Sequence, residues 1–209
     1  MVSFLSKGLF ITIFFAVATT INAQKLHVAV YYESLCGDSI RFITNQLNPA
    51  YEDLKNHIEI LFVPFGKSWR NGGERFMCQH GPDECAGNMI QSCTLNAINA
   101  PGNGDPDASM KYVACQMAPG AEASGQQCAA SVGIDYSFVS QCVSGGLGQQ
   151  LQYGAEKATH EIAYPYPRFV PTIVYNRRFD QKLQNRSLYD FVGVVCELIR
   201  NEAPVCSGR

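Results

Sequence analysis

The residue best suited to chemistry is Cys36, which lies where a predicted strand gives way to a predicted helix. At the start of a helix, backbone N–H groups without partners and the positive end of the helix dipole face such a side chain. They favour the thiolate, which is the form of cysteine that attacks disulfides. Cys36 is therefore a candidate nucleophile for thiol–disulfide exchange. The alternative is that it forms a structural disulfide.

The number of cysteines favours a free thiol at Cys36. The chain has 9 cysteines, so one is left without an intramolecular partner if all the others pair. Cys36 stands apart from the cysteines of the middle region and of the C-terminal end. It is therefore the cysteine that we expect to remain free.

Ser39 occupies the position where a dithiol oxidoreductase has its second cysteine, three residues after the first. One helical turn would bring its hydroxyl beside Cys36, so we expect Ser39 to donate a hydrogen bond to the thiolate. A hydroxyl cannot complete the second half of a thiol–disulfide exchange.

The elements that must position these side chains follow from the hydrophobic pattern. Alternation over residues 26–32 predicts a strand, and the apolar run at residues 58–63 predicts a second one. Between them, apolar residues recur at helical spacing from Ile40 to the pair Asn48-Pro49, where the helix is expected to end. The first part of the chain is thus predicted to be a strand–helix–strand unit.

The rest of the chain divides into a cysteine-rich region and a mixed C-terminal part. Residues 67–144 are rich in Cys, Gly and Gln and show no clear strand pattern, so we interpret them as a mainly helical insertion stapled by disulfides. Beyond them we expect a helix at 147–160, a strand at 169–175, a hairpin partner at 177–183 and a helix at 187–200. Ser187 and Asp190 are placed to cap the last helix.

This order of elements predicts an α/β protein with a thioredoxin-like fold and a disulfide-stapled, mainly helical insertion. In such folds a cis-proline at the start of the third strand faces the active cysteine, and Pro171 lies at that point. The cis bond would expose the backbone of Val170 to an extended substrate chain. The alternative is an ordinary trans proline at the start of an edge strand.

The segment from residue 78 to residue 93 carries a specific motif, CQHGPDECAGNMIQSC. Its fixed positions are Cys78, Gln79, His80, Gly81, Glu84, Cys85, Asn88 and Cys93. They match the signature of the gamma-interferon-inducible lysosomal thiol reductase (GILT) family. YYESLC at residues 31–36 also resembles that family's active-site strand end, residues 169–175 resemble its proline strand, and Cys196 and Cys206 resemble its tail cysteines.

The resemblance implies a lysosomal or secreted thiol reductase that acts on disulfides of endocytosed proteins at acid pH, with roles in antigen processing and host defence. Its partners would be disulfide-containing protein substrates and a small-molecule thiol as reductant. The family's usual active site has two cysteines separated by two residues, whereas here the second position is Ser39. A two-cysteine mechanism therefore cannot be carried over.

With Cys36 free, the other eight cysteines can form four bridges in 105 arrangements. We expect the pair Cys196–Cys206, because the last predicted helix ends near Arg200 and a turn at Pro204 can fold the tail back. The remaining six are expected to pair within the insertion.

Composition and the N-terminal segment point to the secretory pathway. Residues 1–23 combine Lys7, a short apolar run and a small residue before the expected cleavage point, which is typical of a signal peptide. Residues 24–209 then form a single domain with the insertion at about 67–144.

The formal net charge of −2 gives no basic surface for nucleic acid, and no later run is long enough for a membrane span. Asn185 begins the Asn-x-Ser glycosylation motif, in an expected exposed turn.

Two other interpretations of the same residue types are weaker. The first is a zinc site made of Cys78, His80, Cys85 and Cys93. Its spacing lacks paired short knuckles and an oxidising compartment favours disulfides, so we expect no metal and no other cofactor. The second is a papain-like protease, for which Cys36, His160 and Asn176 have the right order. The aromatic residue expected after that nucleophile is absent.

The sequence therefore supports two hypotheses. In the first, the protein is a single-cysteine thiol oxidoreductase that uses Cys36 as nucleophile, Ser39 to stabilise the sulfur, and Val170 and Pro171 to dock the substrate. In the second, it is a binding module that holds unfolded or cystine-containing proteins without net turnover. Both use the same groove, and Ser39 is the feature that separates them.

Overall fold

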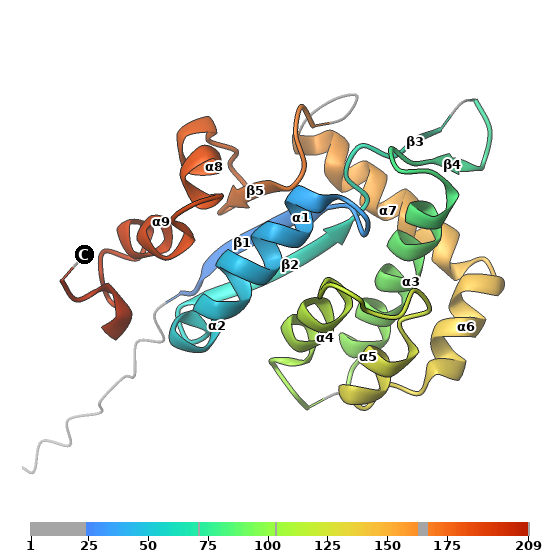
Figure 1. Ribbon diagram of the computed structural model, residues 1–209, viewed down its shortest axis with the longest axis horizontal. Coiled ribbons are helices and arrows are strands. Elements are labelled where there is room, and N and C mark those ends of the chain that lie inside the picture. Colours follow the sequence, from blue (N-terminus) through green and yellow to red (C-terminus); the bar gives the residue numbers. More distant parts are fainter. Residues whose placement is uncertain (1–23, 71, 103, 163–166, 209) are drawn as a thin grey trace, which may run out of the picture.

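The computed structural model describes residues 24–70, 72–102, 104–162 and 167–208. The expected signal peptide, residues 1–23, lies outside the described residues. A three-stranded sheet forms the centre of the fold, with β1 (Leu26–Tyr32) between β2 (Ile58–Pro64) and β5 (Thr172–Tyr175) (Figure 1). β1 pairs with β2 in parallel and with β5 in antiparallel orientation.

Both faces of β1 are covered, which explains its nearly continuous apolar sequence. Val28, Val30 and Tyr32 belong to the large core on the face covered by the helices that follow β1. Ala29 and Tyr31 belong to a smaller cluster on the opposite face. That second face is covered by α7 (Leu147–Ile162) through its apolar side chains.

The helix after β1 is longer than the sequence pattern indicated. α1 (Gly37–Phe42), a π-helical turn η1 (Ile43–Leu47) and α2 (Asn48–Leu54) follow each other without a break. The expected end at the Asn48-Pro49 pair is wrong: the proline lies at the start of α2, directly after the π-helical turn, and the helical run continues through it. Figure 1 shows this helical run lying across one face of β1 and β2.

The cysteine-rich region is mainly helical, as expected. It contains α3 (Pro82–Ile98), α4 (Ala108–Gln116), α5 (Gln126–Ser131) and α6 (Tyr136–Ser144), which gather beside the sheet in Figure 1. It also contains a small hairpin of β3 (Trp69–Arg70) and β4 (Phe76–Met77), which the sequence did not indicate. Two-residue strands are too short to leave an alternating pattern.

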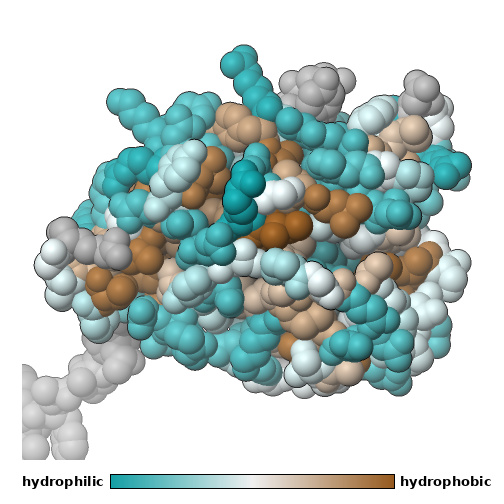
Figure 2. Space-filling view, viewed as in Figure 1, coloured by the Kyte–Doolittle hydropathy of each residue, from teal (hydrophilic) through white to brown (hydrophobic). Residues whose placement is uncertain are grey.

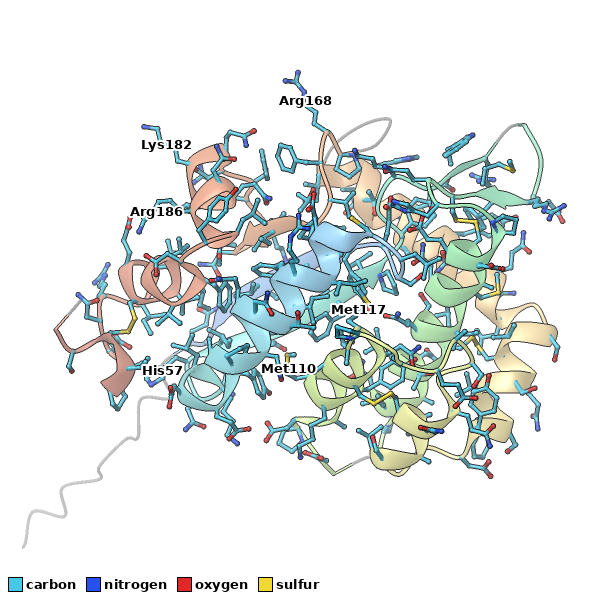
Figure 3. The ribbon with its side chains drawn as sticks, in the orientation of Figure 1. His57, Met110, Met117, Arg168, Lys182 and Arg186 are labelled. Atoms are coloured by element: carbon cyan, nitrogen blue, oxygen red, sulfur yellow. A yellow bond between two sulfur atoms is a disulfide. The ribbon has the colours of Figure 1, made fainter. Side chains whose placement is uncertain are left out.

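Four disulfides staple the fold, and their sulfur atoms are yellow in Figure 3. Three pairs lie within the insertion: Cys78–Cys85, Cys93–Cys142 and Cys115–Cys128. The fourth, Cys196–Cys206, joins α9 (Phe191–Leu198) to the short helix η2 (Pro204–Cys206). These pairings agree with the expectation, and Cys36 is the free cysteine of the part described.

The C-terminal region corrects two expectations. Residues 177–183 do not form the expected hairpin strand: Arg178 makes a single antiparallel bridge to Tyr175 of β5, and α8 (Gln181–Ser187) begins three residues later. The Asp180 carboxylate caps α8 by accepting hydrogen bonds from the backbone N–H groups of residues 182 and 183. The expected helix at 187–200 is divided. Ser187 ends α8 and is buried against Tyr175, while Asp190 alone caps α9 by accepting a hydrogen bond from the Gly193 N–H.

Within the described ranges, no helix is long and apolar enough to cross a membrane.

We expect the Cys93–Cys142 bridge to contribute more stability than Cys196–Cys206. All four cysteines are buried, so the two pairs differ mainly in sequence separation, 49 against 10 residues. Loop closure in the unfolded chain predicts losses of about 4 and about 3 kcal/mol when each pair is replaced by alanines. Urea unfolding followed by circular dichroism measures both losses. Equal losses would contradict this ranking.

Candidate active site

Cys36 lies at the N-cap of α1, after the three-residue loop 33–35 that follows the carboxyl end of β1. Its carbonyl oxygen accepts a hydrogen bond from the Ile40 N–H at 3.0 Å, and its own N–H donates to the Glu33 carbonyl at 3.3 Å. The side chain is half-buried. The thiol therefore lies at the start of a helical run that continues to residue 54, and solvent can reach it.

The loop before β5 faces this thiol, as the sequence predicted. The Val170–Pro171 peptide bond is cis, and the Val170 carbonyl oxygen lies 3.7 Å from Cys36 Sγ. Buried Gln184 of α8 holds this loop, because its Nε2 donates to the Pro171 carbonyl at 2.9 Å and its Oε1 accepts from the Ile173 N–H at 2.7 Å. The sequence gave no signal for Gln184, since its partners are eleven and thirteen residues away.

Ser39 makes a different contact from the one that we expected. Its side chain is fully buried, and its Oγ accepts a hydrogen bond from the Glu33 N–H at 3.4 Å. The hydrogen bonds of the described residues include none between Ser39 Oγ and Cys36 Sγ. The reason is orientation: Ser39 points into the interior from the first turn of α1, whereas Cys36 caps that helix.

The signature motif forms the turn that leads into α3 and the first half of that helix. The Cys78–Cys85 disulfide joins the turn to the helix, and Gly81 takes a φ of 90°, which a glycine adopts without strain. Gln79 is exposed in this turn. Cys93 anchors the other half of α3 to α6.

Three members of the motif lie next to the loop that carries Cys36. His80 Nδ1 lies 2.5 Å from Glu84 Oε2 and 3.6 Å from Glu33 Oε2. Asn88 Oδ1 accepts a hydrogen bond from the Ser34 N–H at 2.8 Å. Glu33 and Ser34 come from the segment between β1 and Cys36, so the motif and the nucleophile belong to one site although more than forty residues separate them.

Glu33 was missed by the sequence analysis and is fully buried in this site. Burial raises the pKa of its carboxyl from the ordinary value of 4.5 to about 6; the hydrogen bond from the Lys67 N–H opposes the rise, and the Glu84 carboxylate adds to it. The signal available in the sequence was an acidic residue at the end of an apolar strand, three residues before the candidate nucleophile.

The geometry removes the two alternative sites. Cys78, Cys85 and Cys93 are all in disulfides and cannot serve as thiolate ligands of zinc. Asn176 hydrogen-bonds to the His27 N–H at the start of β1, whereas Cys36 follows the end of that strand. A strand of this length separates them by roughly 20 Å.

The fold is shared with a solved structure, the DsbA of Chlamydia trachomatis. The TM-score is 0.56 at 12% sequence identity, and the match covers 85% of this chain and 88% of that one. This similarity shows the fold, a thioredoxin-like one. A free thiol at the helix start, opposite the proline loop, is what thiol–disulfide exchange requires. The fold and the position of the free thiol place the chain in the thioredoxin-like class.

Residues 27–132 match the family model described as gamma interferon inducible lysosomal thiol reductase (GILT). GILT-like protein 1 of Drosophila melanogaster is 34% identical over 91% of this chain and 82% of its own length. The gamma-interferon-inducible lysosomal thiol reductase of Carassius auratus is 32% identical over 90% of this chain and 74% of its own length. The chain belongs to the GILT family.

Proposed function

We propose that this protein reduces or exchanges disulfides of protein substrates through the single nucleophile Cys36. The observation that carries the proposal is the arrangement of the one free thiol of the described residues, half-buried at a helix start and 3.7 Å from the Val170 carbonyl. The N-terminal end of a helix favours the charged sulfur that attacks a disulfide.

The reaction proceeds in two stages. The Cys36 thiolate attacks one sulfur of the substrate disulfide and forms a mixed disulfide, and the other substrate sulfur leaves as a thiolate that takes a proton from solvent. A small external thiol then attacks Cys36 Sγ and releases the second substrate thiol. A second molecule of that thiol restores Cys36 and leaves as the oxidised small disulfide, so two small thiols are consumed for each substrate disulfide reduced.

Ser39 supports the first stage and cannot perform the second. Its hydroxyl oxygen accepts a hydrogen bond from the Glu33 N–H and so helps to fix the backbone just before Cys36. A hydroxyl does not displace sulfur from a disulfide, so release depends on the external thiol. Turnover is therefore slower than with a second cysteine.

Substrate docking is proposed at the loop of Val170 and Pro171, with apolar side chains nearby. Leu35, next to the nucleophile, and Phe179, beside the loop through its contact with Phe169, are both exposed. Figure 2 shows apolar side chains among polar ones on the face that carries α1. Exposed apolar groups around a reactive thiol suit an unfolded, extended substrate chain.

The proposed location is the secretory pathway, ending in the lysosome or the extracellular space. Four disulfides support an oxidising compartment, and the signal peptide expected at residues 1–23 supports entry to it. The family description also suggests that the protein acts at acid pH, on endocytosed proteins and in host defence. Asn185 is exposed and available for a glycan, although it lies in α8 rather than in the expected turn.

The second candidate function is a binding module that captures cystine-containing proteins without turnover. Ser39 is the observation that favours it, because an enzyme without an internal resolving thiol holds its mixed disulfide until another thiol arrives.

The concentration of an external monothiol separates the two functions. With a disulfide-bonded substrate such as insulin at about pH 5, we expect mixed disulfides on Cys36 when cysteine is scarce and steady reduction when cysteine is abundant. Non-reducing gels and intact mass measure the first, and substrate thiols the second. Absence of turnover at every cysteine concentration would favour the binding module.

A further inference from the structure

The loop that carries Cys36 is docked on the first half of α3. The Ser34 N–H donates to Asn88 Oδ1 at 2.8 Å, and Ser34 Oγ donates to the Glu84 carbonyl at 3.1 Å. Between these two residues lies Gly87, where an added Cβ would meet Ser34 Oγ at 2.5 Å. A side chain at position 87 would therefore push against the Ser34 side chain, through which the loop contacts α3.

Glu33 joins this loop to two further segments at the same edge of the sheet. Its Oε1 accepts a hydrogen bond from the Lys67 N–H, in the loop that follows β2, at 2.6 Å. A Cβ on Gly66 would lie only 2.4 Å from the Glu33 Cγ, so the glycine leaves room for this side chain. Its Oε2 is buried without a hydrogen bond and lies 3.6 Å from His80 Nδ1, in the turn before α3.

Both oxygens of the Glu84 carboxylate contact His80. Its Oε1 accepts from the His80 backbone N–H at 3.1 Å, and its Oε2 lies 2.5 Å from His80 Nδ1. His80 and Glu84 thus form a hydrogen-bonded pair rather than an open set of ligands for a cation, and Glu33 Oε2 lies beside this pair as an unsatisfied buried oxygen.

We propose that Glu33 is a positioning residue for Cys36: together with His80, Glu84 and Asn88 of the signature motif it clamps residues 33–35 onto α3, and the clamp closes best when the Glu33 carboxyl is protonated. The inference rests on the proposed role of Cys36 as nucleophile and assigns a task to the motif. It also links the site to acid pH through a group that does not touch the substrate.

Burial is the main reason why the protonated form of Glu33 is preferred, and the nearby charges act in both directions. Glu84 repels a second buried carboxylate, and His80 and Lys67, which face Glu33 from the turn before α3 and from the loop after β2, attract it. Burial raises the pKa of Glu33 to about 6, so the folded protein holds this proton more tightly than a free carboxyl does. The contribution of the protonated Glu33 carboxyl to the stability of the folded protein is complete below pH 4.5. It is lost as the pH rises through about 6.

The first test is the pH profile of Glu33→Gln, which keeps an acceptor for the Lys67 N–H and cannot ionise. The readout is the rate at which Cys36 forms a mixed disulfide with oxidised glutathione, followed by intact mass. The ratio of the variant's rate to that of the wild type is expected to be within about twofold of one at pH 5 and about tenfold at pH 7, where the wild-type carboxyl is ionised. Glu33→Ala, which loses the acceptor, should be slower at both pH values. A ratio that stays constant with pH overturns the proposal.

The second test separates positioning from stability. Alanine is the better helix former, yet Gly87→Ala pushes against Ser34 and is expected to slow mixed-disulfide formation about tenfold. Gln91→Ala is the matched control: it removes a buried amide from the same helix, bonded to Tyr32 rather than to the loop. It should lower the melting temperature and leave the rate within about twofold. Equal slowing in both variants overturns the clamp.

A metal site and a lack of turnover would each give a distinct result. A rise in melting temperature with Zn²⁺ in the wild type that Glu33→Gln abolishes would overturn the clamp in favour of a metal site. A wild type that forms the mixed disulfide but never turns over would refute the proposed reductase. The clamp is tested in either case, because its readout is the first reaction of Cys36 alone.

Discussion

Cys36→Ser is expected to reduce protein disulfides no faster than the external monothiol alone, a loss of at least about a hundredfold, and to trap no substrate. The reason is that the hydroxyl does not attack a disulfide, and the described residues offer no second free thiol. Insulin reduction at about pH 5 with cysteine measures turnover, and non-reducing gels of quenched reactions measure trapping.

The matched control for Cys36→Ser replaces two cysteines that lie away from the active site. Replacing Cys196 and Cys206 by alanine deletes a disulfide joining α9 to η2, away from the loop that carries Cys36. We expect this double variant to be less stable and still to reduce insulin at nearly the wild-type rate. A Cys36→Ser protein that reduced insulin as fast as the wild type would make the reductase proposal wrong.

The sequence was sufficient for the parts of the site that depend on local order. Cys36 could be placed because a buried strand and a helix meet there, and both signals span only a few residues. Pro171 could be placed because it stands at the start of the third predicted strand. The free thiol followed from an odd count of cysteines, which needs no structure at all.

The contacts that complete the site could not be predicted in this way. Glu33 meets His80 across 47 positions of sequence, and Ser34 meets Asn88 across 54. No periodicity records such pairs, and the signature motif showed only that its residues belong together. The same limit explains Gln184, whose side chain holds the proline loop from α8, a helix that begins within the range 177–183 where we had expected a hairpin strand.

The predicted start of the last helix was wrong for a local reason. Asp190 was assigned as the partner of a cap at Ser187, whereas it is itself the cap of α9. Ser187 is buried, with its hydroxyl bonded to Tyr175 and to the Leu183 carbonyl. A serine at the end of one helix and an aspartate at the start of the next give the same spacing as a capping pair, so only tertiary packing distinguishes them.

Ser39→Cys is expected to convert the single-cysteine mechanism into a two-cysteine one. Positions three residues apart on a helix lie about 5 Å apart between Cα atoms, within the range that a disulfide spans. The new thiol would attack the mixed disulfide on Cys36 from within the protein, at an effective concentration that an external thiol does not reach. Residue 39 points into the interior, so its side chain must rotate toward Cys36 Sγ before it can attack.

The expected result is a mixed-disulfide lifetime shortened at least about a hundredfold at millimolar cysteine, together with an oxidised form of the protein that carries five disulfides instead of four. Rapid quenching with acid and intact mass follow the lifetime, and peptide mapping without reductant locates the new bridge. Ser39→Ala is the control: it also removes the acceptor of the Glu33 N–H, but it supplies no thiol, so its mixed disulfides should persist as in the wild type. If Ser39→Cys and Ser39→Ala released substrate equally slowly, residue 39 would not be within reach of Cys36, and the absence of a second cysteine would not be what limits turnover.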